Sequence, residues 1–417
     1  MPTAPTQPQS PPSFLAFRHP GFRIFLVGGT LAMMADNIEH VITYWAVYQQ
    51  FKSEELAGFA VISHWLPFLV LSVPMGALAE RVDPRRMIQC GMALFMLVSI
   101  TWGVLILTGA LQLWHAAVLL VLHGCAGVLW MPPTQLLLHD IVGREGLQSA
   151  IRLNATGRYL GMLVGPMLGS GLLLALGPAY GLFANALFYL PLTLWLLKAP
   201  YGPKFRTTQT APSVAVRSVK DVFTAIGSIG QYPVIATMTM LAAGAAFFVG
   251  NAYQAQMPGF ADALGHGDPG VAYAMLLAAD AAGALTAGIA LESMGLLRPN
   301  PRTALILALL WSIALASFAL IPYYTLALVL LFCAGFLELS FNSMNQTLVQ
   351  LHAPPEQRGR IIGVFSMAAS GMRMFSGVSV GLVGGLVGIH WSLALSAACV
   401  AMLVTGLMVK RGASRSG

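Results

Sequence analysis

Long uninterrupted runs of apolar residues follow one another along the chain, separated by short polar segments. About 20 apolar residues cross the hydrocarbon core of a bilayer as one α-helix, whereas the strands of a membrane β-barrel alternate in polarity. The runs in this chain are continuous, so the pattern predicts an all-α integral membrane protein. We predict twelve transmembrane helices, over residues 21–49, 57–79, 87–109, 113–138, 147–176, 179–198, 231–257, 269–292, 302–321, 324–351, 359–386 and 388–409.

The low content of charged residues places the chain in the same class. Of the 417 residues, 57% are hydrophobic and 9% are charged, whereas soluble domains carry about 25% charged residues. A soluble globular domain and a disordered chain are therefore excluded. The net charge is +7, but no basic stripe with interleaved aromatic residues occurs, so we expect no nucleic-acid partner.

Lysine and arginine residues cluster in alternate connections between the predicted helices. When the N-terminus is placed in the cytoplasm, Lys52 is the only basic residue in an outer loop, and the outer connection at 258–270 contains none. Basic residues accumulate on the cytoplasmic side of membrane proteins. We therefore predict a multi-pass protein of the cytoplasmic (inner) membrane with both termini in the cytoplasm.

The two halves of the chain resemble each other, because one constant offset relates small and acidic residues at matching positions of the predicted helices. The pairs are Gly76 and Gly288, Glu80 and Glu292, Gly165 and Gly377, and Gly169 and Gly381. Such repeats are typical of transporters in which one helix bundle moves against another, so we predict two pseudo-symmetric six-helix bundles. The predicted segments are a disordered cytoplasmic tail at 1–17, an N-terminal bundle at 18–198, a cytoplasmic linker at 199–230, a C-terminal bundle at 231–410 and a cytoplasmic tail at 411–417.

A charged motif follows the second predicted helix. Its residues are Gly76, Glu80, Arg81, Asp83, Arg85 and Arg86. The motif resembles the signature of the major facilitator superfamily, with glutamate where that family usually has aspartate. A glycine permits close helix contact, and a carboxylate at a helix end can pair with arginines and with a neighbouring helix dipole. The resemblance implies a cytoplasmic gate; the alternative is that the arginines only anchor the topology.

A second motif lies in the fifth predicted helix and comprises Gly161, Gly165, Pro166 and Gly169, followed by Ser170. It resembles the antiporter motif of the exporters in the superfamily, except that Ser170 replaces its last glycine. Glycines four residues apart allow two helices to approach closely, and proline kinks a helix. The alternative is ordinary packing of small residues, which is common in membrane helices.

The resemblance extends over nearly the whole chain. The segments FRHPGFRIFLVGGTLAMMADN, GALAERVDPRR, MPPTQLLLHDIVGREGLQSAIRLN and PPEQRGRIIGVFSM resemble the branch that contains macrolide and siderophore exporters. The resemblance implies the major facilitator fold, a monomeric protein and a central cavity lined by helices one, four, seven and ten. It also implies an acidic residue in the first helix, and Asp36 matches this expectation. Related drug antiporters have an arginine four residues before a glycine in the fourth helix, where this chain has His123 before Gly127.

Six charged residues lie near the middle of predicted helices, where each costs about 2.5–3.5 kcal/mol on insertion scales, so we expect them to face a cavity or each other. They are Asp36, Glu39, Arg158, Asp280, Glu338 and Arg373. Asp36, Glu39 and His40 share one face of the first helix by spacing. Two carboxylates so close suit reversible proton binding, and His40 could share that role or be an ordinary core histidine.

Further polar residues follow helical spacing in the seventh and tenth predicted helices. They are Asn251 and Gln254 in the seventh, and Glu338, Asn342 and Asn345 in the tenth. We expect both stripes to line the central cavity. For Arg373, a structural salt bridge with Glu338 or Asp280 is the alternative.

These observations favour a proton-coupled exporter of an amphipathic small molecule, such as a drug or a siderophore-like metabolite, working by rocker-switch alternating access. Its partners would be the substrate, protons and the lipid bilayer, and the proton gradient would take the place of any cofactor. One alternative is efflux of a divalent metal by Asp36, Glu39 and His40; another is a non-transporting receptor. An enzyme is not expected, because the G-x-S-x-G sequence at 377–381 lies inside a predicted helix rather than on a strand-to-helix turn.

Overall fold

The computed structural model describes residues 14–51, 54–205, 218–250, 252–264, 269–376 and 387–416, and within these ranges the regular structure is entirely helical. The long helices are α1 (Pro20–Phe51), α2 (Glu54–Arg81), α3 (Pro84–Leu107), α4 (Leu113–Leu187), α10 (Pro269–Ser293), α11 (Pro301–Leu320), α12 (Tyr324–His352) and α16 (Ile389–Ser416). The shorter helices are α5 (Leu190–Lys198), α6 (Val219–Ser228), α7 (Pro233–Phe248), α8 (Ala252–Ala255), α9 (Met257–Ala263), α13 (Arg358–Ser366) and α14 (Arg373–Ser376). Single turns complete the order: η1 (Leu15–Arg18), η2 (Pro203–Phe205), η3 (Ile229–Gln231), η4 (Pro355–Gln357) and the π-helical η5 (Met367–Gly371).

Helix α4 joins the fourth and fifth predicted helices and the first part of the sixth into one bent element, and α5 contains the last part of the sixth. The backbone of α4 leaves the helical region only at Gly143 (φ +67°) and Gly177 (φ +75°), where glycine adopts a positive φ without the clash of a Cβ atom. The predicted connections at 139–146 and 177–178 are thus breaks at single glycines rather than loops. Pro166 lies in the helical stretch between these two breaks.

The seventh predicted helix, 231–257, is wrong beyond residue 248. Helix α7 ends at Phe248, and Gly250 has a left-handed conformation (φ +49°) with its N–H donated to the carbonyl of Ala245. This C-terminal turn is the usual way in which a glycine ends a helix. The chain continues in the short helices α8 and α9.

Two other predictions differ from the structure in their details. The predicted linker 199–230 contains helix α6, which begins with a reciprocal capping box between Ser218 and Asp221. The eleventh predicted helix, 359–386, comprises α13, η5 and α14, and its remainder lies outside the described residues.

The prediction of an all-α membrane protein is confirmed. Seven described helical stretches are long and apolar enough to cross a membrane, or eight if the bent pair Val219–Gln231 and Pro233–Phe248 forms one span. The stretch Leu113–Phe205 counts once among them although it contains both glycine breaks. Helix α1 is not among the seven, and its polar residues at 36–40 lower its hydropathy. The number of twelve crossings stays a prediction.

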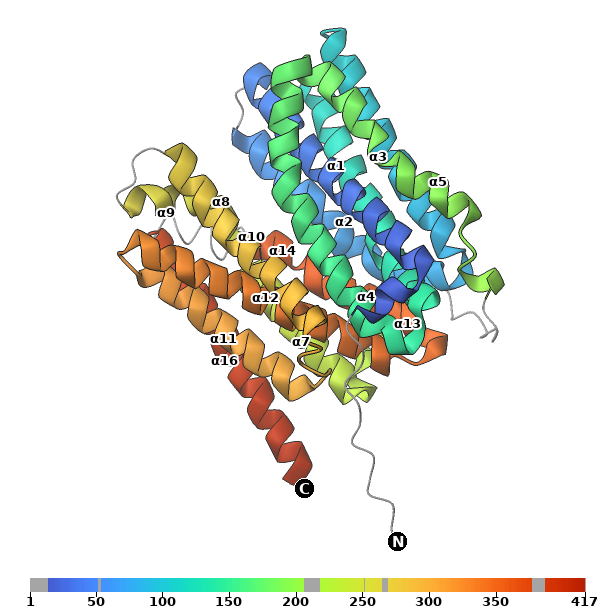
Figure 1. Cartoon of the computed structure of the whole chain (residues 1–417), viewed down its shortest axis with the longest axis vertical. Coiled ribbons are helices and arrows are strands. Elements are labelled where there is room, and N and C mark those ends of the chain that lie inside the picture. Colours follow the sequence, from blue (N-terminus) through green and yellow to red (C-terminus); the bar gives the residue numbers. More distant parts are fainter. Residues whose placement is uncertain are drawn as a thin grey trace.

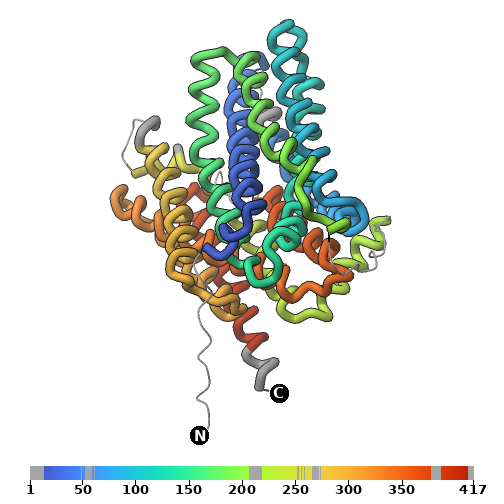
Figure 2. Tube along the Cα trace, turned by 45° about the vertical axis from the view of Figure 1, so that its right-hand side comes forward, coloured from blue at the N-terminus to red at the C-terminus, as the bar shows by residue number. Residues whose placement is uncertain are grey.

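The helices of the two halves of the chain form two neighbouring groups (Figure 1). In the first group, α1, α3 and α4 enclose two apolar cores; in the second, α7, α11, α12 and α16 contribute to one large core. The groups meet where α2 packs on α13 and where α4 packs on α10 and α12. The start of α1 and the end of α16 lie toward the same end of the molecule (Figure 2).

Candidate functional site

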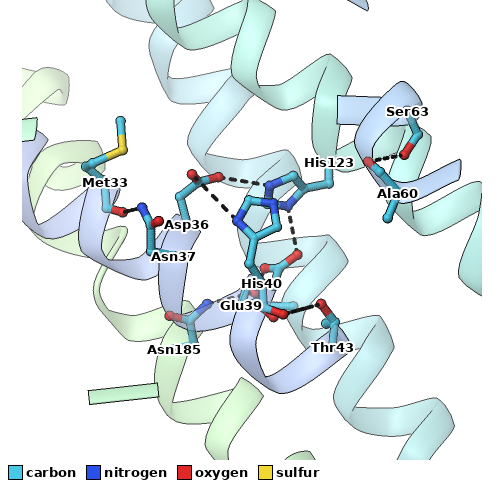
Figure 3. Close-up of polar contacts among 11 residues, drawn as sticks. Met33, Asp36, Asn37, Glu39, His40, Thr43, Ala60, Ser63, His123 and Asn185 are labelled. Atoms are coloured by element: carbon cyan, nitrogen blue, oxygen red, sulfur yellow. Dashed lines mark hydrogen bonds and ion pairs between the residues drawn. The ribbon is translucent and has the colours of Figure 1, made fainter. Parts of the chain in front are cut away.

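His123 of α4 lies between the two carboxylates of α1 (Figure 3). Its Nε2 is 2.9 Å from Oδ1 of Asp36, and its Nδ1 is 2.8 Å from Oε1 of Glu39. All three residues are buried. The carboxylates therefore do not face each other, as their spacing suggested, because the imidazole separates them. A neutral imidazole has only one N–H, so donation to both carboxylates at once requires an imidazolium.

Two further polar residues orient Glu39. Ser99 of α3 donates its hydroxyl hydrogen to Oε2 of Glu39, and Nδ2 of Asn185 donates to Oγ of Ser99 at 3.2 Å. Both residues are fully buried. Sequence analysis missed Ser99 and Asn185, because each is a single polar residue in an apolar run and has no spacing signal.

A cavity of about 450 Å³ adjoins this cluster and is lined from both groups of helices. Its polar wall consists of Asp36, Asn37, His40, His64, Arg158, Gln254 and Arg373. Its aromatic wall consists of Tyr44, Trp65, Phe68, Phe95 and Trp130. Glu39 is not part of this wall, so α1 presents Asp36 and His40 to the cavity and turns Glu39 toward Ser99.

Three histidines meet at one side of this cavity. The ring centroid of His40 is 4.8 Å from that of His123 and 5.0 Å from that of His64, and potential ligand atoms of the three lie within 4.8 Å of one another. The metal-binding set suggested by the sequence, Asp36, Glu39 and His40, differs from this group of three histidines. Oδ2 of Asp36 does lie 4.0 Å from Nδ1 of His40, but the Glu39 carboxylate forms hydrogen bonds with His123 and Ser99 instead. His64 was missed, since it is a single histidine in an apolar run.

A second carboxylate pair lies in the other group of helices, around Tyr253 of α8. The Tyr253 hydroxyl is 3.1 Å from Oδ2 of Asp280 and 3.2 Å from Oε2 of Glu338, and Nε2 of Gln254 lies 3.4 Å from the same Asp280 oxygen. One phenol has a single hydrogen to donate, so it satisfies one of the two carboxylates at a time. Tyr253 was not predicted from the sequence.

A smaller cavity, of about 120 Å³, shares Arg158, Gln254 and Arg373 with the larger one and also has Glu338 and Asn342 in its wall. The two polar stripes predicted from the sequence thus reach the cavities only in part. Asn345 is fully buried and belongs to neither of these two walls. Asp280 lies behind Tyr253 and Gln254 rather than in the walls, and Asn251 lies outside the described residues.

The two arginines predicted for the cavity both line it, one from each half of the chain. Nε of Arg158 is buried and has no hydrogen-bond partner among the described residues. The guanidinium carbon of Arg373 lies 5.2 Å from the centre of the Trp65 ring, and its Nε donates to the carbonyl of Ala369 at 3.1 Å. Glu338 and Arg373 face the same smaller cavity.

The charged motif at 76–86 joins the two groups of helices. Oε1 of Glu80 accepts hydrogen bonds from the backbone N–H groups of Gly359 and, at 3.1 Å, of Arg360, at the first turn of α13. Gly76 lies against Gly359 so closely that a Cβ atom on either residue would overlap the other's carbonyl oxygen. Helices α2 and α13 can therefore cross at this distance only with glycine at both positions.

The second-half counterpart of this motif also makes contact across the two groups. Glu292, at the end of α10, accepts a hydrogen bond from the hydroxyl of Ser149. The guanidinium of Arg152 donates to the carbonyls of Leu291 at 3.0 Å and Leu297 at 2.7 Å. Ser149 and Arg152 of α4 were missed by sequence analysis, although the Glu80–Glu292 pairing pointed to the region.

The remaining residues of the motif organise the connection between α2 and α3. The side chain of Asp83 caps α3 by accepting from the backbone N–H of Arg85 at 3.0 Å, and it also pairs with the Arg85 guanidinium. Burial raises the pKa of Asp83, but these bonds from Arg85 outweigh it and lower the pKa below its usual value. The side chains of Arg81 and Arg86 are exposed.

The glycines of the second motif face α1. A Cβ atom at Gly161 would lie 2.9 Å from Cβ of Met33, and one at Gly165 would lie 2.7 Å from Cβ of Asn37. At Gly169 the nearest atom would be Cα of Ile38, at 3.1 Å. The motif therefore lies where α4 and α1 approach closely, next to the carboxylates of α1.

Comparison with known proteins agrees with this architecture. The family model described as Major Facilitator Superfamily matches residues 24–377. Enterobactin exporter EntS of Shigella boydii is 25% identical over 408 residues, which cover 94% of this chain and 91% of the relative. The human organic anion transporter MFSD10 and the Escherichia coli fucose:proton symporter FucP each have a TM-score of 0.70 at 12% identity, covering 93% of this chain and 98% of theirs. These structures support the fold alone.

Proposed function

This chain belongs to the major facilitator superfamily, and we propose that it is a secondary active transporter that exports a siderophore-like small molecule in exchange for protons. The similarity to enterobactin exporters supports both the direction and the kind of substrate. It would act as a monomer in the cytoplasmic membrane, with both termini in the cytoplasm and the proton gradient as its energy source. The arrangement of basic residues in the sequence supports this orientation.

The observation that carries the proposal is the position of His123 between Asp36 and Glu39, beside a cavity lined from both halves of the chain. Two carboxylates and one imidazolium carry a net charge of −1, so the cluster can accept one proton without leaving a bare positive charge. A proton on Asp36 would remove one of the two charge-assisted hydrogen bonds that join α1 to α4. Protonation would thereby loosen α1, the helix that also contributes Asn37 and His40 to the cavity wall.

Alternating access would then depend on the contacts at the end of the molecule where α2 meets α13. In the proposed orientation this end is cytoplasmic, and the bonds from Glu80 to α13 and from Arg152 to the end of α10 close it. Opening the cavity toward the cytoplasm requires both contacts to break. Their pseudo-symmetry is the arrangement expected when two bundles, related by an axis along the membrane normal, rock against each other.

The test is transport by the purified protein in proteoliposomes, with enterobactin as substrate and an imposed pH gradient. We expect Asp36→Asn and Glu39→Gln to abolish gradient-driven accumulation while exchange of labelled for unlabelled enterobactin continues without a gradient. Glu145→Gln, which alters an exposed carboxylate at the second segment of α4, is the matched control and should transport normally. Wild-type accumulation by both cluster variants under the gradient would refute proton coupling through this site.

A further inference from the structure

We propose that the transported molecule carries an anionic group on an aromatic ring system, and that Arg158 and Arg373 bind the anion from the two halves of the chain. The inference rests on the proposed function in one respect, because it takes the cavity as the transport site. It adds the chemical class of the ligand and the residues that recognise it.

The first ground is that the carboxylates in the cavity walls have hydrogen-bond partners within the protein, whereas one of the arginines has a buried donor without a partner in the described part of the chain. Asp36 pairs with His123, and Glu338 shares the Tyr253 hydroxyl with Asp280, so both acidic groups of the walls have a hydrogen-bonding neighbour within the protein. Nε of Arg158, in contrast, is buried without a hydrogen-bond partner among the described residues. A buried donor on a cationic group costs free energy when it is unpaired, and a bound anion would remove that cost.

The second ground is the position of Arg158 at the junction of the cavities. It lines the larger cavity, the smaller cavity and a third pocket of about 30 Å³, next to Trp130 and Gln135. A ligand in either of the two main cavities therefore meets this guanidinium. The planar fork of an arginine suits carboxylates and other planar anions, which it can bind by two parallel hydrogen bonds.

The third ground is the aromatic character of the surrounding wall. The guanidinium of Arg373 lies over the Trp65 ring at 5.2 Å, and Trp65 lines both main cavities. Phe68, Phe95 and Trp130 extend the aromatic surface of the larger one. Aromatic rings pack against one another in offset or edge-to-face arrangements. A ligand ring could occupy this wall while its anionic group reaches the arginines.

Binding from both halves would also give the ligand a place in the transport cycle. Arg158 belongs to α4 in the first half, and Arg373 to α14 in the second. An anion between two cations of separate bundles lowers their mutual repulsion. A bound anion would therefore favour close approach of the two bundles at the level of Arg158 and Arg373. Without the anion, the repulsion between the two arginines would favour separation of the bundles there.

The test measures binding rather than transport, with a matched pair of probes of nearly the same shape, one anionic and one neutral. The full-length protein in nanodiscs is titrated with benzoate and with its neutral analogue benzamide, and affinities are read from calorimetry or from competition with labelled enterobactin. We expect the acid to bind more tightly than the amide. Arg158→Gln should weaken the acid by about 10- to 150-fold, the range for a lost charged hydrogen bond, and leave the amide within about twofold.

Three variants keep the outcome decisive. Arg158→Lys retains the charge but lacks the planar fork of the guanidinium, so it should keep part of the preference for the acid. Arg373→Gln should lower that preference as Arg158→Gln does. Arg144→Gln, at an exposed arginine, is the control and should leave both affinities unchanged. Retained binding of the amide shows that a variant is folded. Equal losses for acid and amide, or no preference in the wild type, would overturn the proposal. Because no gradient is involved, a failure of proton coupling leaves this result unaffected, and the reverse also holds.

Discussion

The carboxylate of Glu80 offers the most direct test of the closed state. It lies on α2 but accepts two backbone hydrogen bonds at the first turn of α13, from Gly359 and Arg360. It therefore acts as an N-cap supplied by another helix. Glu80→Ala removes the cap from two N–H groups that have no partner within α13, while the rest of the contact between α2 and α13 remains.

The expected cost can be estimated from these two effects. Loss of an N-cap costs about 0.5–2 kcal/mol, and loss of a negative charge at a helix N-terminus costs about 0.3–1 kcal/mol. Together they amount to about 1–3 kcal/mol, which corresponds to a shift of about 5- to 150-fold between the closed and open arrangements. Glu80→Gln keeps an oxygen acceptor and loses only the charge, so its shift should be about two- to fivefold.

The assay is hydrogen exchange followed by mass spectrometry on the protein in nanodiscs, using the peptide that contains the start of α13. Exchange of this segment reports opening of the contact, because local opening exposes the amides that Glu80 protects. The expected order of exchange rates is wild type, Glu80→Gln, then Glu80→Ala. Glu356→Ala, which removes an exposed charge one turn away without a bond to α13, should stay close to wild type. An unchanged rate in Glu80→Ala, or an equal rise in Glu356→Ala, would refute the capping role.

Three further predictions concern other residues of the same end of the molecule. Gly76→Ala should weaken the closed contact between α2 and α13, because the added Cβ would overlap the backbone of α13. Gly171→Ala is the control, since the space around its Cβ position is open. For both variants, opening is measured as the accessibility of an engineered cysteine in the cavity to a thiol reagent. Asp83 has a lowered folded-state pKa, so its stabilising effect is present above its unfolded pKa of about 4 and disappears as pH falls through the folded value. The difference in melting temperature between wild type and Asp83→Asn should therefore shrink as pH falls below about 4. An equal difference at about pH 6 and about pH 3 would contradict this. Arg152→Ala removes the charged hydrogen bonds to the carbonyls of Leu291, Leu296 and Leu297. It should open the contact between α4 and the end of α10 and lower the melting temperature, at a cost of about 3 kcal/mol or more. A melting temperature equal to that of wild type would show that these bonds contribute nothing.

The sequence predicted the class of the protein and the boundaries of most helices, because both depend on local properties. Hydropathy over 20 residues decides whether a segment enters a bilayer, and α1, α10 and α12 begin and end within a few residues of their predictions. The exceptions depend on single glycines. Gly143 and Gly177 bend a continuous helix, and Gly250 ends one, and hydropathy does not reveal which glycine adopts a positive φ.

The candidate site was predicted only in its separate parts. Asp36, Glu39 and His40 share a helix face by spacing, and the energetic cost of buried charge identifies Arg158 and Arg373. The residues that surround these charges, however, carry no pattern in the sequence. His64 and Ser99 are single polar residues in apolar runs, and Tyr253, which joins Asp280 and Glu338, has no spacing that marks it. A residue of this kind becomes recognisable only when the fold places it beside a carboxylate.

Sequence alone therefore determined that this chain is an all-α membrane protein, that its charges are costly and where they lie along the helices. The tertiary structure decided which of them meet. It placed His123 between Asp36 and Glu39, turned Glu39 away from the cavity and brought Glu80 to the start of α13. The physical reason is that burial follows from the composition of one segment, whereas a hydrogen bond between helices depends on how segments far apart in the chain rotate and pack against one another.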